Sequence, residues 1–185
     1  GNVTFSATPT FSAVAVSFGV SVGIGVLLGG MLGAIAGFYG GFSDTIIMRI
    51  MDVMLSIPST ILAISICAAL GPGLTNTMIA VGVGSIPSYA RLVRSSVLTV
   101  KDQEYIEAAK AIGGNNKRII IRHVIPNVLA PVIVQASMGV ASSILAAAGM
   151  SFIGLGIQPP NPEWGAMLSA GRSYIRDSPH MVLFP

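Results

Sequence analysis

Three long stretches of this sequence contain no charged residue, and this feature constrains the fold more than any other. The stretches cover residues 1–43, 53–90 and 124–162. A membrane-spanning helix needs only about 20 consecutive apolar residues, so each stretch can hold at least one span. Charged residues make up 9% of the chain, against about 25% in an average soluble domain. The sequence therefore predicts an all-α, polytopic transmembrane helical bundle.

Glycine, proline and charged residues divide these stretches into separate spans. Gly71-Pro72-Gly73 is expected to form a tight turn, Pro58 is expected to bend the second span, and the prolines between positions 159 and 162 exclude a helix interior. The predicted spans cover residues 14–38, 53–70, 74–90 and 127–155, and a further span begins at 180–185.

The whole chain, 1–185, is expected to form one membrane domain. It begins with Gly1 instead of Met, has no basic segment before the first apolar run, and ends as a new apolar stretch begins. We therefore expect a fragment of a longer subunit, without its first span and without the end of its last span.

Glycines recur every four residues in the first predicted span. A bare stripe of this kind allows a neighbouring helix to approach closely in lipid, where packing holds helices together. We therefore assign these glycines to helix packing: Gly25, Gly29, Gly33 and Gly37.

A short polar segment follows the first span. It contains Asp44, Arg49 and Asp52, and Arg49 and Asp52 are i, i+3 neighbours if the segment is helical. These charges are expected at the membrane interface, because a charge at the bilayer centre costs about 2.5 to 3.5 kcal/mol.

Seven of the ten Lys and Arg residues lie between Arg91 and Arg122. Lys and Arg are enriched in cytoplasmic loops, which explains this cluster more simply than nucleic-acid binding. Placing the loop in the cytoplasm puts the turn at residues 71–73 and the proline-rich loop outside. The external loop holds only Arg172 and Arg176, so the charge asymmetry supports this orientation.

Residues 99–126 of the basic loop are predicted to form a helical hairpin at the membrane surface. The segment Thr99-Val100-Lys101-Asp102 fits a capping box. The first helix should run to Ile112 and end at Gly113-Gly114, and Asn115 or Asn116 should cap the second helix, which Pro126 limits. The apolar face of the first helix is expected to consist of Tyr105, Ile106, Ala109 and Ile112.

The hairpin sequence resembles the cytoplasmic signature of the permease subunits of ABC importers. That signature is Glu-Ala-Ala, three residues, Gly, nine residues, and an apolar-x-apolar-Pro ending. This chain has Glu107-Ala108-Ala109, Gly113 and Pro126 at that spacing, but His123 replaces the first apolar residue and Ile125 the usual Leu. The ending Arg122 to Asn127 resembles the branch that imports dipeptides, oligopeptides or nickel.

The resemblance implies a permease subunit in the cytoplasmic (inner) membrane of a prokaryote. Its implied partners are ATP-binding subunits at the cytoplasmic loop, a second permease subunit, an extracytoplasmic solute-binding protein and membrane lipid. It implies peptide import, with nickel as the alternative cargo, and ATP hydrolysis on separate subunits. The residues implied to couple to the ATP-binding subunit are Glu107, Ala108, Ala109, Gly113 and Pro126.

No catalytic, cofactor-binding or metal-binding residues are expected. The single cysteine, Cys67, has no metal-ligand cluster around it in the sequence. A secondary transporter or channel that works without ATPase subunits is the main alternative function, and a structural scaffold is another. Secondary transporters commonly place ionisable groups at mid-membrane, and the four predicted spans show none. The candidate pathway residues are neutral: Ser65, Asn76, Ser85, Gln135 and Ser142.

Overall fold

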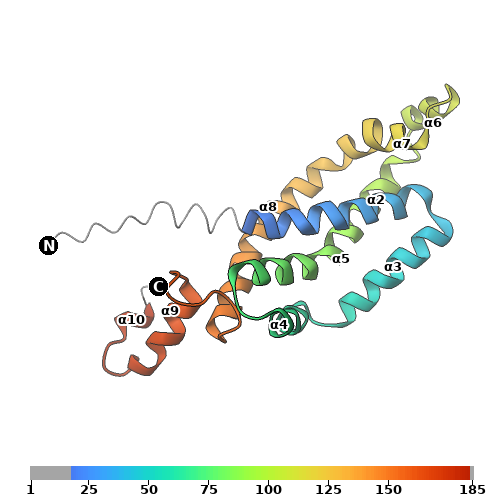
Figure 1. Cartoon of the computed structure of the whole chain (residues 1–185). Helices are drawn as coiled ribbons and strands as arrows, with labels where there is room; N and C mark the ends of the chain where they lie inside the picture. Colours follow the sequence, from blue (N-terminus) through green and yellow to red (C-terminus); the bar gives the residue numbers. More distant parts are fainter. Residues whose placement is uncertain (1–17, 184–185) are drawn as a thin grey trace.

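The computed structural model describes residues 18–183, and the regular secondary structure in this range is entirely helical. This confirms the all-α prediction. Positions 14–17 of the first predicted span and positions 184–185 of the last one lie outside the described residues. The basic hairpin and the C-terminal helices lie at opposite ends of an elongated bundle (Figure 1).

A long apolar helix, Phe18–Tyr39, opens the described structure. It includes a π-helical turn, η1 (Gly25–Gly29), and continues as α2 (Gly30–Tyr39). It ends at Gly40, whose φ of 64° is easily reached only by a residue without a Cβ.

The second predicted span, 53–70, is divided between two helices that meet at Pro58. α3 (Gly41–Ser56) contains the polar segment, α4 (Ser59–Leu70) follows, and the two are bent by 84°. A proline pushes the residue before it out of the helical region, and Ile57 is extended, with φ −98° and ψ 124°. The bend expected at Pro58 is therefore a complete break.

The third predicted span lies in α5 (Leu74–Val100), which continues ten residues past the expected end at Ala90. No Gly or Pro occurs between Arg91 and Val100 to stop it. The first part of the expected cytoplasmic loop is therefore the end of this helix.

The helical hairpin consists of α6 (Glu104–Ala111) and α7 (Asn116–Ile119). As predicted, a left-handed glycine ends the first helix, since Gly113 has a φ of 82°. The Asn115 side chain caps the second helix by accepting a hydrogen bond from the Lys117 N–H. The capping box at 99–102 is wrong, because Thr99 is still inside α5 and donates its hydroxyl to the Ser95 carbonyl.

Pro126 does not limit the second hairpin helix as predicted. The helical path continues from α7 through a π-helical segment, η2 (Ile120–Val124), into α8 (Ile125–Phe152). The Ile125 N–H already bonds five residues back, to the Ile120 carbonyl. Because the α-helical ladder is interrupted there, the missing N–H of Pro126 removes little.

Within residues 18–183, two helices are long and apolar enough to cross a membrane, Phe18–Tyr39 and Asn116–Phe152. The bent pair α3–α4 would make a third if it counts as one span. Most of the expected span, 127–155, lies in the second of these helices. The helix ends at Phe152, before the expected end, and Gly154 beyond it has a φ of 82°. α5 is not among these helices, so a span at 74–90 stays a prediction.

α5 is the central helix, since it packs against η1, α2, α3, α4 and α8. Figure 1 shows α2 and α5 side by side. The four glycines assigned to helix packing, at positions 25, 29, 33 and 37, face α5. A Cβ at Gly29 would lie 2.5 Å from the Ile86 carbonyl oxygen, and one at Gly37 would lie 3.0 Å from that of Arg94. The two backbones are therefore in contact.

The C-terminal part packs on the far end of α8. It consists of α9 (Trp164–Gly171), η3 (Arg172–Tyr174) and α10 (His180–Leu183). The Glu163 carboxylate accepts a hydrogen bond from the Ala166 N–H at the start of α9. A Cβ at Gly165 would collide with the Ala148 backbone, so α8 and α9 also touch through a glycine.

The α2–α5 contact gives a direct prediction. A Gly33→Ala substitution would push a methyl group into the Ala90 carbonyl and to 3.0 Å from the Arg94 N–H nitrogen. We expect it to lower the stability of the purified protein by about 1 to 3 kcal/mol, as overpacking commonly does. Thermal unfolding in detergent measures this.

Gly30→Ala is the matched control, because its Cβ would meet only Val93, at 3.9 Å. Equal melting temperatures for the two variants would show that the backbones are not in contact at Gly33.

Candidate functional site

The hairpin is joined to the membrane helices by one buried cluster, which we term the hairpin core. Ile106 and Ala109 of α6 and Ile119 of α7 are at most 8% exposed. They pack with buried residues of three long helices. These are Ala34, Val93, Val97, Val124, Val128 and Val132. The hairpin is thus anchored in the same packing as α2, α5 and α8.

The predicted apolar face of α6 is only half buried. Ile106 and Ala109 belong to the hairpin core, whereas Tyr105 is 43% and Ile112 87% exposed. The helix is shorter than expected and ends at Ala111, so Ile112 falls in the turn that follows. Both exposed side chains are therefore accessible to a partner.

Two further contacts fix the angle of the hairpin. A Cβ at Gly114 would lie 2.6 Å from the Ala109 carbonyl oxygen, so the turn closes tightly on α6. The Lys110 ammonium lies 5.8 Å from the ring centroid of Phe38, at the end of α2, within the range of a cation–π contact.

The residues of the Glu-Ala-Ala signature divide between the core and the surface. Ala109 is buried, whereas Glu107, Ala108, Gly113 and Pro126 are exposed. Neither ion pair found in residues 18–183 involves Glu107. An exposed carboxylate beside a small alanine offers a partner a charge and a close approach.

Two ion pairs connect α3 to α5, and sequence reasoning missed both. The Asp44 carboxylate accepts two hydrogen bonds from Arg94, each 2.5 Å long. Asp52 accepts one from Arg91 at 2.6 Å, instead of pairing with Arg49 on its own helix. The sequence held a signal for these pairs. A cytoplasmic basic loop also puts the segment from Asp44 to Asp52, one span away from the turn at 71–73, on the cytoplasmic side.

A cavity of about 400 Å³ lies between the α3–α4 break, α5 and α8. All residues that line it are uncharged. Three of the candidate pathway residues, Ser85, Gln135 and Ser142, are among them, together with Ser59, Ser88 and Tyr89.

Ser65 and Asn76, the other two candidates, do not line this cavity. The Ser65 hydroxyl donates to the Ile61 carbonyl of its own helix. The Asn76 amide donates to the carbonyls of Leu70 and Gly71 at the end of α4. Both side chains are used to satisfy local backbone groups.

Several cavity side chains remain able to bind a solute. The Ser85 and Ser142 hydroxyls donate to carbonyls of their own helices, which leaves their oxygens as acceptors. The Tyr89 hydroxyl lies 3.3 Å from the Gln135 carbonyl. The side chains of Ser88 and Gln135 are exposed. The cavity can therefore exchange hydrogen bonds with an uncharged polar group.

No group of three His, Cys, Asp or Glu side chains that could hold a metal ion occurs within residues 18–183. The buried thiol of Cys67 packs with Ala63, Ala80 and Met150.

Known proteins share both the sequence and the fold. Residues 29–183 match the family described as binding-protein-dependent transport system inner membrane component. A dipeptide transport system permease protein, DppC of Alkalihalophilus pseudofirmus, is 52% identical over 142 residues, which make up 77% of this chain and 47% of that protein. A glutathione transport system permease protein, GsiD of Shigella flexneri, is 46% identical over 142 residues, which again make up 77% of this chain and 47% of that protein. This chain therefore spans about half the length of these relatives.

The fold is shared with a chain of the MetNI methionine ABC transporter in inward-facing conformations, at a TM-score of 0.72. That chain is 18% identical in sequence, and the match covers 98% of this chain and 88% of that one. The resemblance seen in the hairpin sequence is thus confirmed over most of the chain. This protein belongs to the family of inner membrane components of binding-protein-dependent transport systems.

Proposed function

We propose that this chain is part of a permease subunit of an ATP-driven importer, and that it forms part of the path that carries peptides across the cytoplasmic membrane of a prokaryote. One observation carries the proposal. The hairpin exposes Glu107 and Ala108 on one side and buries Ile106 and Ala109 among the membrane helices on the other. The similar dipeptide and glutathione permeases support the choice of cargo.

ATP hydrolysis is assigned to separate subunits that dock on the hairpin. A docked subunit that moves would displace α6, and the hairpin core links α6 to α2, α5 and α8. Packed interiors resist compression and transmit displacement. The Asp44–Arg94 and Asp52–Arg91 pairs would carry the same movement to α3.

The uncharged cavity is the proposed solute path within this subunit. Its hydroxyl and amide groups suit the amide groups of a peptide backbone. The cavity suits a nickel ion less well than a peptide, because none of the lining residues is His, Cys, Asp or Glu, the side chains that commonly bind metals. An ion-driven secondary transporter is not favoured either, since the lining offers no side chain that titrates near neutral pH.

α5 is proposed to cross the membrane although it is less apolar than the other spans. A helix at the centre of a bundle contacts protein on several sides and can carry more polar residues than one that faces lipid. The α5 residues that pack against its neighbours include buried Thr77, Tyr89 and Ala90. The second permease subunit and an extracytoplasmic binding protein complete the proposed assembly.

Reversing the charge of Glu107 tests the docking role. We expect Glu107→Lys to reduce ATP-driven uptake in proteoliposomes by at least about tenfold, because losing one partner of a docked charge pair commonly costs 2 to 5 kcal/mol. The readout is uptake of a labelled dipeptide by the whole assembly, with copurification of the ATP-binding subunits.

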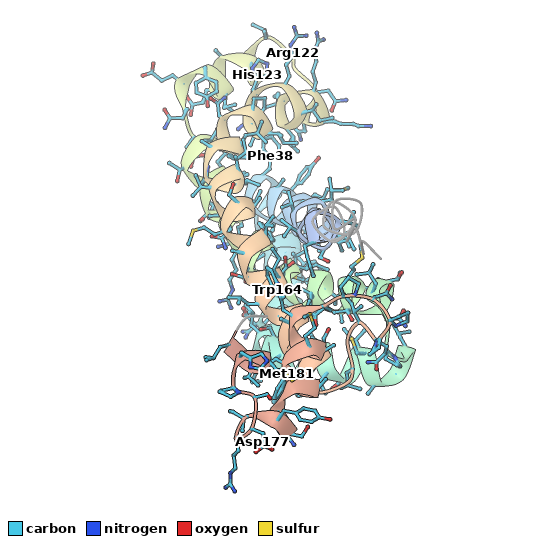
Figure 2. The ribbon with its side chains drawn as sticks, turned by 90° about the vertical axis from the view of Figure 1, so that its left-hand side faces the viewer. Phe38, Arg122, His123, Trp164, Asp177 and Met181 are labelled. Carbon is cyan, nitrogen blue, oxygen red and sulfur yellow. The ribbon has the colours of Figure 1, made fainter. Side chains whose placement is uncertain are left out.

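Asp177→Lys is the control, because Asp177 is also exposed but lies at the opposite end of the molecule (Figure 2). Normal uptake with Glu107→Lys would rule out a docking role for this residue. Uptake without ATP would rule out an ATP-driven importer.

The cavity makes a separate prediction. Gln135→Leu removes an exposed amide from the lining without adding charge. We expect dipeptide uptake to fall about three- to tenfold, since a hydrogen bond contributes about 0.5 to 1.5 kcal/mol. ATP hydrolysis without solute should stay normal. Ser65→Ala, outside the cavity, should leave uptake unchanged, and equal uptake rates for both variants would contradict the proposed path.

A further inference from the structure

A basic groove lies on the second helix of the hairpin, beyond the Glu-Ala-Ala segment. It has a volume of about 390 Å³. Its lining is Asn115, Lys117, Arg118, Ile121 and Arg122, with three cations and no acidic residue. Figure 2 shows Arg122 at this end of the molecule, far from Asp177. We refer to these five residues as the basic groove.

The cations of the basic groove have no acidic partner in the described part of the chain. Both ion pairs there use other arginines, Arg91 and Arg94. Lys117, Arg118 and Arg122 are all exposed. The groove therefore concentrates positive charge that an external anion can neutralise.

The groove continues directly into an apolar surface on the same helical path. Ile121, Ile125, Leu129 and Ile133 are between 37% and 60% exposed. The 11 steps along the chain from Arg122 to Ile133, at about 1.5 Å each, extend about 16 Å along a helix. Half of a bilayer's hydrocarbon core is about 15 Å thick. The charged groove and the apolar surface together thus match the length of one lipid in one leaflet.

We propose that the basic groove binds the headgroup phosphate of an anionic phospholipid of the cytoplasmic leaflet. The acyl chains of this lipid lie along Ile125, Leu129 and Ile133. Clusters of Lys and Arg on the cytoplasmic side of a span attract anionic headgroups. The bound lipid holds the α7 side of the hairpin at the membrane surface.

The position of the groove favours a lipid over the docked ATP-binding subunit. Glu107 and Ala108 lie on α6, whereas the cations lie on α7 and η2. A soluble protein that covered the cations would leave the adjoining isoleucines and leucine to be covered by something else. A phospholipid covers both surfaces with one molecule.

Lipid retention in the purified assembly tests this proposal. The assembly is titrated with phosphatidylglycerol or phosphatidylcholine in detergent, and bound lipid is counted by native mass spectrometry. We expect preferential binding of phosphatidylglycerol. The double variant Arg118→Gln/Arg122→Gln should bind it about 30-fold more weakly, because each basic residue near an anionic surface contributes about fivefold in affinity.

Two control variants distinguish the loss of charge in the groove from a general loss of charge or of folding. Arg172→Gln/Arg176→Gln removes the same charge from exposed positions at the other end of the chain and should bind phosphatidylglycerol normally. Arg118→Lys/Arg122→Lys keeps the charge and should bind within about threefold of wild type, since the attraction to an anionic headgroup is largely that of point charges.

Three outcomes would overturn the proposal. Equal retention of both lipids would show that the groove does not select an anion. Displacement of phosphatidylglycerol by millimolar inorganic phosphate would identify a soluble phosphate site. Unchanged lipid binding, combined with loss of the ATP-binding subunit from the Arg118→Gln/Arg122→Gln variant, would assign the groove to the protein interface.

Discussion

The close contact between the first helix and α5 is the interaction on which the other helices depend. In a membrane, helices associate through packing and not through exclusion of water, so the glycines that let these backbones touch set the distance between the two helices. The other helices α3, α4 and α8 pack around α5. Because α5 runs on to Val100, its position also determines where the hairpin begins. The Asp44–Arg94 and Asp52–Arg91 pairs join α3 to the same helix.

The hairpin core gives this arrangement its proposed function. Ile106, Ala109 and Ile119 pack into the cluster that also holds Val97 and Val128. A force on Glu107 or Ala108 would therefore act on the membrane helices through a close-packed interior. The cavity between the α3–α4 break, α5 and α8 lies within the helices that such a movement would shift.

Much of this could be predicted from the sequence, because charge-free runs, glycine spacing and turn residues act locally. Gly113 ends α6 and Asn115 caps α7 as expected. The errors arose where tertiary packing decides the outcome. The continuation of α5 past Ala90 fits the absence of Gly and Pro there, but no local feature shows that Asp52 pairs with Arg91 or that a π-helical turn allows the helix to continue through Pro126. The cavity could be anticipated only in part, since Ser85, Gln135 and Ser142 line it but Ser65 and Asn76 do not.

The hairpin core requires the hairpin and the membrane helices to move as one body. Spin labels at Ile112→Cys and Met138→Cys, both exposed positions, would measure the distance between the hairpin and α8. The measurement uses the assembled transporter with Cys67 replaced by alanine. A second label pair, on the hairpins of this subunit and of the proposed second permease subunit, would report whether ATP causes movement. We expect ATP to change the distance between the two hairpins while the distance from 112 to 138 stays constant. A change in the distance from 112 to 138 on addition of ATP would contradict it.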